Sequence, residues 1–315
     1  MQEPGAREVT HEISVSAPAD AVYQLIADVG NWPRIFPPSV HVDQIERTGS
    51  QERIRIWATA NGEAKTWTSR RRLDPEALRV EFRQEVSQPP VGAMGGAWVI
   101  ERVSDTESRV RLLHDYRAVD DDPDKLAWID RAVDRNSAAE LAALKANAEL
   151  AGAAEELLLS FEDAVHVDGP AKDVYDFINE AQWWSERLPH VARVSLREDS
   201  PRLQLLEMDT RTRDGSVHTT TSVRVCFPHR KIVYKQIVVP ALMTVHTGYW
   251  LLAETDSGVR ATSQHTVVLN PANITKMLGD GAGVEDARQF VRSALSANSL
   301  ATLDHAKKYA ERQQS

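Results

Sequence analysis

The chain has 315 residues, 42% of them hydrophobic and 26% charged, which is typical of a globular protein long enough to form two hydrophobic cores. Its net charge of −9 argues against nucleic acids and anionic membranes as partners, because clustered Lys and Arg bind both. The single cysteine, Cys226, excludes an internal disulfide, and residues 1–14 lack the basic start and apolar run of an export signal. We therefore expect a cytoplasmic protein.

The first part of the chain predicts a strand, a helix and then many strands. Residues 11–16 alternate between polar and apolar side chains, as a short strand does. Apolar residues recur at helical spacing from Pro18 to Val29, and Trp32-Pro33 then ends this helix. Six alternating runs follow, separated by turn signals such as Asn61-Gly62, and predict a meandering antiparallel sheet at 40–47, 52–59, 64–73, 78–86, 95–103 and 109–118.

A long helix is predicted over residues 122–150. Asp122 is a good N-cap, Pro123 fits the first turn, and one stripe of the helix is apolar: Leu126, Ile129, Val133, Leu141 and Leu144. A strand, short helices, a curved antiparallel sheet and a long last helix describe a helix-grip arrangement. In it the sheet curls around the last helix and leaves a pocket between them. The predicted fold class is α+β.

The second half of the chain repeats the first. Residues 16–37 overlay residues 168–189 without a gap, so that Pro18 pairs with Pro170 at an offset of 152 residues. The ends match as well, with NSAAELAALK at 136–145 and NSLATLDHAK at 298–307. The ten added residues are expected in a longer loop at 270–283, which is rich in glycine. We therefore predict two tandem helix-grip domains, at 1–150 and 151–315, joined by a helix that runs into a strand over 147–163.

Strand alternation predicts which side chains face the pockets. On strand 64–73, Trp67, Ser69 and Arg71 share a face, and on strand 78–86 the apolar face carries Phe82 and Gln84. The repeat supplies the matching residues of the second half, Ser222, Arg224, Tyr234 and Gln236. A buried arginine without a partner costs several kcal/mol, so an inward arginine in both halves is difficult to explain by packing. The alternative is that both arginines face solvent.

Other candidates also have two interpretations. Trp32, Phe36 and Trp98 either line the mouth of a pocket or belong to the core. His114 and Tyr116 share a strand face and either exchange protons with a ligand or make structural hydrogen bonds. His218, His246 and His265 lie on three predicted strands without the spacing of a metal motif, and no nucleotide or nucleophile motif occurs. We expect neither a metal nor a cofactor.

The sequence resembles the di-domain aromatase/cyclases of bacterial type II polyketide synthases, members of the START-like helix-grip superfamily. The resemblance covers nearly the whole chain, through SAPADAVYQLIADVGNWPRIFP, the WTSRR strand, RNSAAELAALK and the diverged second copy. It implies pockets that receive a poly-β-ketone chain from an acyl carrier protein and close and aromatise its first ring. The protein would then work beside other polyketide synthase components in antibiotic biosynthesis.

The residue pattern of single-domain relatives carries over onto both halves. Their Trp-Pro and W-x-S-x-R residues fall on Trp32, Trp67, Ser69 and Arg71, and in the second half on Trp184, Ser222 and Arg224, with Thr220 in place of the strand tryptophan. Ser39 stands where such relatives can carry a tyrosine. The resemblance thus implies substrate contacts from one set of residues: Trp32, Phe36, Trp67, Phe82, Gln84, Trp98, Tyr116, Trp184, Tyr234, Gln236 and Trp250.

The expected chemistry needs no cofactor, because a methylene between two ketones is already acidic and ring closure chiefly requires orientation. Arg71 or Arg224 would stabilise the enolate or alkoxide charge. Ser69 or Ser222 would hydrogen-bond the departing hydroxyl, and His114, Tyr116 or a water would move the proton. Two alternatives remain: a non-catalytic carrier of apolar small molecules, and a protein in which only one domain is active.

Overall fold

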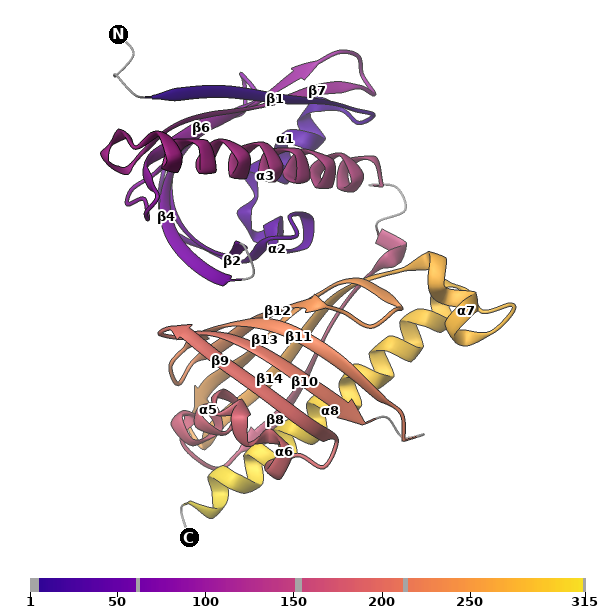
Figure 1. Cartoon of the computed structure of the whole chain (residues 1–315). Coiled ribbons are helices and arrows are strands. Elements are labelled where there is room, and N and C mark those ends of the chain that lie inside the picture. The colour runs from indigo at the N-terminus through magenta and orange to yellow at the C-terminus, as the bar shows by residue number, and fades with distance from the viewer. Residues whose placement is uncertain (1–5, 61–62, 151–154, 212–214, 314–315) are drawn as a thin grey trace. The chain divides into compact units, whose positions relative to one another are not determined.

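The computed structural model describes residues 6–60, 63–150, 155–211 and 215–313. The chain divides into two compact units, Met1–Gly152 and Ala153–Ser315, called here the N-domain and the C-domain. Each contains one seven-stranded antiparallel sheet and a long C-terminal helix (Figure 1). The predicted α+β fold with two tandem helix-grip domains is therefore confirmed.

The N-domain sheet has the strand order β1-β7-β6-β5-β4-β3-β2, so the first strand closes the sheet beside the last. The chain follows the predicted sequence of elements closely. The predicted Asn61-Gly62 turn lies outside the described residues. The strands are β1 (Arg7–Val15), β2 (Ser39–Thr48), β3 (Gln51–Ala60), β4 (Glu63–Asp74), β5 (Arg79–Gln84), β6 (Val91–Arg102) and β7 (Ser108–Ala118).

The N-domain helices cover one face of this sheet (Figure 1). Helix α1 (Ala19–Ala27), the turns η1 (Val29–Asn31) and η2 (Val119–Asp121), and α2 (Trp32–Ile35) are short, whereas α3 (Pro123–Glu149) has 27 residues. The carboxylate of Asp122 accepts hydrogen bonds from the backbone N–H groups of Asp124 and Lys125, which confirms it as the N-cap. The apolar stripe of α3 packs on β1 and β7 and, with α1, closes the core.

The C-domain repeats this topology, with the order β8-β14-β13-β12-β11-β10-β9. Its helical elements are α5 (Ala171–Asn179), η3 (Ala181–Trp183), α6 (Trp184–Arg187), η4 (Pro271–Asn273), α7 (Ile274–Leu278) and α8 (Val284–Arg312). Its strands are β8 (Leu158–Val167), β9 (Val191–Ser200), β10 (Leu203–Arg211), β11 (Val217–Phe227), β12 (Lys231–Val238), β13 (Met243–Thr255) and β14 (Gly258–Leu269).

Two differences from the predicted elements stand out. The segment 270–283 is not only loop, because η4 and α7 form within it and Ile274 is buried in an apolar cluster. The predicted passage from helix to strand over 147–163 is described at its two ends, where α3 ends at Glu149 and β8 begins at Leu158, while residues 151–154 lie outside the described residues. No helix in the described part of the chain is both long and apolar enough to span a membrane.

Candidate active site

The two arginines singled out by strand alternation occupy equivalent places in the two sheets. On β4, Arg71 lies opposite Phe82 of β5, and on β11, Arg224 lies opposite Tyr234 of β12. The one-residue difference in offset between the halves arises at the two ends of β11, because the connection before this strand is one residue longer than its N-domain counterpart and the connection after it is one residue shorter. Both arginine side chains point inward, with exposures of 3% and 2%. The alternative that they face solvent is therefore wrong.

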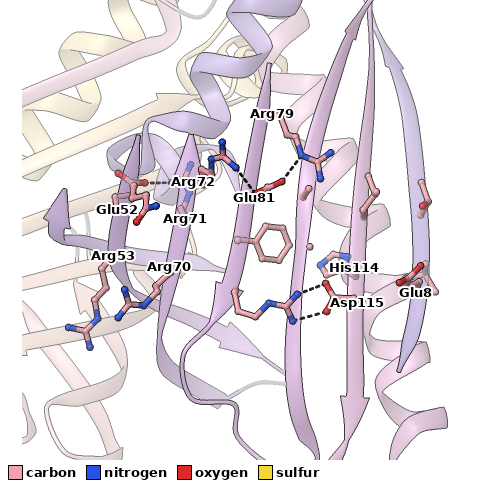
Figure 2. A pocket seen from close by; sticks show the side chains of 18 of the residues that line it. Glu8, Glu52, Arg53, Arg70, Arg71, Arg72, Arg79, Glu81, His114 and Asp115 are labelled. Atoms are coloured by element: carbon pink, nitrogen blue, oxygen red, sulfur yellow. Dashed lines mark hydrogen bonds and ion pairs between the residues drawn. The ribbon is translucent and has the colours of Figure 1, made fainter. Parts of the chain in front are cut away.

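Arg71 is held by the N-domain on three sides. Its Nη2 donates to the carbonyl oxygen of Ile26 at 2.9 Å, at the C-terminal end of α1, and its Nη1 lies 3.0 Å from Oε1 of Glu52 on β3. The guanidinium lies 5.0 Å from the ring centre of Trp32. Burial lowers the pKa of Arg71 to about 10, and the negative charge of Glu52 opposes this shift. The buried pair is visible in Figure 2, beside the exposed Arg70 and Arg72.

Arg224 has the same backbone contact but a different neighbour. Its Nη2 donates to the carbonyl oxygen of Ile178 at 2.6 Å, and its guanidinium lies 5.3 Å from the ring centre of Trp184. Opposite it on β10 stands the neutral Gln204, where the N-domain has Glu52. Among the described residues, Nη1 of Arg224 has no hydrogen-bond partner. Desolvation lowers the pKa of Arg224, as expected for a buried charge.

A cavity of about 130 Å³ lies inside the C-domain beside Arg224. It is bounded by β10 to β14, by Trp184 of α6, and by α8 through Leu295, Asn298, Ser299 and Thr302. No aspartate or glutamate is among the lining residues in the described part of the chain. All six of the site residues expected for the second half line this one cavity: Trp184, Ser222, Arg224, Tyr234, Gln236 and Trp250.

The cavity wall carries a chain of hydrogen-bonding groups centred on His265. Its Nδ1 lies 2.9 Å from the hydroxyl of Tyr234 and 3.0 Å from Nε2 of His246. Its Nε2 lies 2.6 Å from Oγ of Ser299. Since that hydroxyl donates to the carbonyl oxygen of Leu295, it accepts from His265, and we assign the imidazole proton to Nε2 and the lone pair to Nδ1.

Burial keeps these groups neutral at neutral pH. It lowers the pKa of His246 to about 3 and that of His265 to about 4, and it raises the pKa of Tyr234. The site therefore offers a tyrosine hydroxyl in contact with an unprotonated imidazole. Sequence reasoning named Tyr234 as a binding residue, weighed the two histidines as metal ligands, and missed Ser299. The Asn-Ser pair that is repeated at 136–137 and 298–299 would have been the signal for it.

The N-domain has only part of this hydrogen-bonded series of side chains. His114 occupies the place of His265, and its Nδ1 lies 3.5 Å from Oγ of Ser137, the counterpart of Ser299. Phe82 replaces Tyr234 and packs edge-on against His114 at 5.5 Å between ring centres. Met94 stands in place of His246. Burial lowers the pKa of His114 to about 4.

A glycine lets the aromatic ring approach the strand in each domain. A Cβ at Gly96 would lie 1.9 Å from the carbonyl oxygen of Leu113 and 2.8 Å from the ring of Phe82. A Cβ at Gly248 would lie 2.2 Å from the carbonyl oxygen of Gln264 and 2.5 Å from the hydroxyl of Tyr234. These two positions therefore require glycine so that the ring and the histidine can meet.

The other N-domain candidates have structural partners. Ser69 donates to the carbonyl oxygen of Arg83, and Gln84 accepts a hydrogen bond from Ser87. Phe36 and Trp98 are buried together in the main core, 6.1 Å apart, and Trp67 packs against a smaller apolar cluster. The hydroxyl of Tyr116 donates to Asp130 of α3 at 2.6 Å. Tyr116 thus takes the structural role that the sequence left open, rather than one in proton transfer.

Glu140 of α3 is a polar group that sequence reasoning missed. It occupies the position of Thr302, which lines the C-domain cavity, and it is partly buried. Among the described residues it has no hydrogen-bond or ion-pair partner. Desolvation alone raises the pKa of its carboxyl to about 7. A lone carboxyl inside a helix stripe that otherwise packs on the sheet would have been the sequence signal.

An open hollow of about 770 Å³ lies over the N-domain sheet, and its labelled arginines are mostly paired with acids (Figure 2). Arg83 makes two hydrogen bonds to Asp115, at 2.7 and 2.8 Å, and Arg79 pairs with Glu81 at 2.9 Å. Arg53 and Arg70 share Glu85, which is outside the hollow's lining. These exposed ion pairs contribute about 0–1 kcal/mol each and describe a solvated surface rather than a closed pocket.

The three histidines considered as metal ligands do not form a metal site. His246 and His265 meet in the cavity, and His218 also lines it. Within residues 6–60, 63–150, 155–211 and 215–313, no group of three or more His, Cys, Asp or Glu side chains is placed to hold a metal ion.

Comparison with known proteins identifies relatives along the whole chain. The family model "Polyketide cyclase / dehydrase and lipid transport" matches residues 15–136 and 167–294. A granaticin polyketide synthase bifunctional cyclase/dehydratase from Streptomyces virginiae is 54% identical over 94% of this chain and 97% of its own. An actinorhodin polyketide synthase bifunctional cyclase/dehydratase from Streptomyces coelicolor is 46% identical over 97% of this chain and 98% of its own.

Two solved structures share both domains. The di-domain aromatase/cyclase BexL from the BE-7585A biosynthetic pathway is 65% identical with a TM-score of 0.90, covering 97% of this chain and 99% of its own. The di-domain aromatase/cyclase StfQ from the steffimycin biosynthetic pathway is 37% identical with a TM-score of 0.87, over the same shares of the chains. The resemblance drawn from the sequence is confirmed, and the chain belongs to the polyketide cyclase/dehydrase and lipid transport family.

Proposed function

We propose that the protein is a polyketide cyclase/dehydratase that closes the first ring of a poly-β-ketone and removes water from it to give an aromatic ring. The observation that carries this proposal is the C-domain cavity, where a buried guanidinium faces the same space as a tyrosine–histidine pair. The names of the relatives, bifunctional cyclase/dehydratase, support both steps. Delivery of the chain by an acyl carrier protein, catalysis without a cofactor and a cytoplasmic location stay predictions.

Ring closure begins with loss of a proton from a methylene between two carbonyls. The oxygen of Tyr234 takes this proton while its own hydroxyl proton moves to the free Nδ1 of His265. Arg224 stabilises the enolate oxygen that results. The weakly basic imidazole keeps its second proton only while the substrate carries negative charge. The enolate carbon then forms a bond to the carbon of a ketone further along the chain. The oxygen of that ketone becomes an alkoxide, which receives the proton stored on His265 through the hydroxyl of Tyr234.

Dehydration uses the same groups. A second methylene proton passes to Tyr234 and His265, the carbon–oxygen bond of the new alcohol breaks, and the departing hydroxide receives the stored proton and leaves as water. Ser222, which lines the cavity together with Arg224, would hydrogen-bond the departing oxygen. Both residues of the pair return to their starting state, so no co-reactant is consumed.

The polar groups on the cavity wall favour a catalytic role over a carrier role. A carrier of apolar molecules needs no such groups, whereas this wall presents histidine, tyrosine, serine, threonine and arginine side chains among its apolar ones. A carrier also gains nothing from a buried charge, which costs free energy unless it meets a polar ligand.

The test is product analysis with a reconstituted minimal polyketide synthase. Addition of the protein should replace irregularly cyclised products by products with an aromatic first ring, and Arg224→Met should abolish the change. An unchanged product mixture in the presence of the folded wild-type protein would overturn the proposal.

A further inference from the structure

The two domains differ in how they balance the charge of their inward arginine. In the N-domain the residue across the strand pair is Glu52, whose carboxylate lies 3.0 Å from Arg71. In the C-domain the same register position holds Gln204, which is also buried, at 2% exposure, but carries no charge. One substitution in the repeat therefore separates a neutralised guanidinium from one that keeps its full positive charge.

The described surroundings of Arg224 supply no other negative charge to the cavity. None of the lining residues within 155–211 and 215–313 is acidic. The acid that interacts with Arg224 is Glu198, which is exposed on β9 and already accepts hydrogen bonds from Nε2 of Gln204 at 2.9 Å and from the backbone N–H of Arg202 at 2.8 Å. Gln204 thus stands between the surface acid and the buried guanidinium.

A buried cation without a counter-ion is costly, and its cost is relieved when an anion enters beside it. Nη1 of Arg224 has no hydrogen-bond partner among the described residues, so a donor is available for such an anion. Tyr234, the cross-strand neighbour of Arg224, and His246 add further polar groups to the lining. The chemistry of the cavity is therefore that of an anion site.

The size of the cavity limits the anion to a single ring. At about 130 Å³ it is close to the roughly 150 Å³ of an engineered protein cavity that holds one benzene molecule. The space beside Arg224 therefore takes one six-membered ring with its oxygen substituents, and the rest of a longer chain has to lie outside it.

We propose that the C-domain cavity is a binding site for the enolate anion of a cyclic 1,3-diketone, and that Gln204 is the residue that leaves the charge of Arg224 available to it. This inference deepens the proposed function and takes its ligand class from it. The N-domain arginine, neutralised by Glu52, does not select for charge in this way. The C-domain thus also binds the product of its own ring closure, a ring that still awaits loss of water or enolisation.

The test uses the full chain and two small probes that differ in charge. Cyclohexane-1,3-dione is an enolate anion at neutral pH, and its methyl enol ether is neutral and of similar shape. Isothermal titration should show that the enolate binds at least about tenfold more tightly than the ether, since opposite charges attract strongly in a buried site. Equal binding of the two probes, or no binding of the enolate at millimolar concentration, would overturn the inference.

Two matched substitutions separate charge from shape. Gln204→Glu gives the C-domain the N-domain pairing and should weaken enolate binding at least about tenfold, whereas Gln204→Met keeps the position neutral and should change binding less than about threefold. If Gln204→Glu does not fold, Arg224→Met decides, because it should abolish the preference for the enolate over the ether. A preference that survives in Arg224→Met would show that the guanidinium is not the anion site. These binding measurements need no turnover. The enolate preference can therefore be absent from a protein with cyclase activity, and it can be present in a protein without that activity, so the two proposals are tested separately.

Discussion

The hydroxyl of Tyr234 lies 2.9 Å from Nδ1 of His265, in a domain whose homologous partner has Phe82 beside His114 at the same place. The pair is thus complete in one domain and lacks its hydroxyl in the other. The repeated glycine, histidine and serine show that the framework of the pair is common to both halves, while the proton-carrying group is not.

Removing the hydroxyl of Tyr234 should therefore slow the chemistry without disturbing the cavity. We expect Tyr234→Phe to lower the rate of first-ring formation by about 10²–10⁴-fold, the usual contribution of a general acid–base group. The measurement is the yield of aromatic product from the reconstituted synthase, with the melting temperature as a check of folding. The matched variant is Phe82→Tyr in the N-domain, which should not restore the loss. A Tyr234→Phe protein of full activity would exclude Tyr234 from proton transfer.

The two arginines should differ in what they contribute to stability. Arg71→Met leaves the carboxylate of Glu52 buried without its cation, which should cost about 3–5 kcal/mol of unfolding free energy. Arg224→Met leaves no buried acid and loses one hydrogen bond to Ile178, so about 1–3 kcal/mol is expected. Urea denaturation of the two variants measures the difference. The double variant Arg71→Met with Glu52→Gln should recover part of the loss, and failure to recover any would argue against the ion pair.

Glu140 should make stability fall at alkaline pH. Its pKa is raised from 4.5 to about 7, so the folded state favours the neutral carboxyl and loses stability as the pH rises from about 4.5 through 7. Glu140→Gln removes this loss. We expect the variant to gain about 2–3 kcal/mol relative to wild type between pH 5 and pH 9, measured by urea denaturation at both values. The exposed Glu107 provides the control, since Glu107→Gln should give the same difference at the two pH values.

His246 should make the C-domain sensitive to acid. Its pKa is lowered to about 3, so the stability that comes from burying it neutral is present above pH 6.5 and is lost as the pH falls. His246→Met installs the N-domain residue at this position and should reduce the loss between pH 7 and pH 5 by about 2 kcal/mol. Urea unfolding followed by tryptophan fluorescence measures the free energy of unfolding at the two pH values. An identical pH dependence in the variant and the wild type would mean that His246 binds its proton equally well in the folded and the unfolded protein.

The order of the elements was predictable because it depends on local patterns. Alternation placed every strand of the N-domain sheet within a few residues of its bounds, and the spacing of Asp122 and Pro123 fixed the start of α3. These features need only the period of the side chains along one element. The inward direction of Arg71 was one of two alternatives that alternation allowed, and its burial in the structure decided between them.

The partners of the site were not predictable in this way. The contrast between Glu52 and Gln204 depends on which residue of a neighbouring strand faces the arginine, and that register is set by the whole sheet. The meeting of Tyr234 with His265 joins two strands that are separated by a third, through a glycine that makes room. Alternation along one strand carries no information about either contact.

The offset of β11 has a practical consequence for anyone who exchanges pieces between the two halves. Along this strand Thr220, Ser222 and Arg224 each lie 153 residues after their counterparts Trp67, Ser69 and Arg71, whereas Gln204 on the neighbouring strand lies 152 residues after Glu52. A hybrid joined within the strand by the shorter spacing would turn every later side chain of the strand to the opposite face, and the guanidinium would leave the interior. Splice sites for chimeric enzymes should therefore be counted strand by strand and not by one spacing along the whole chain.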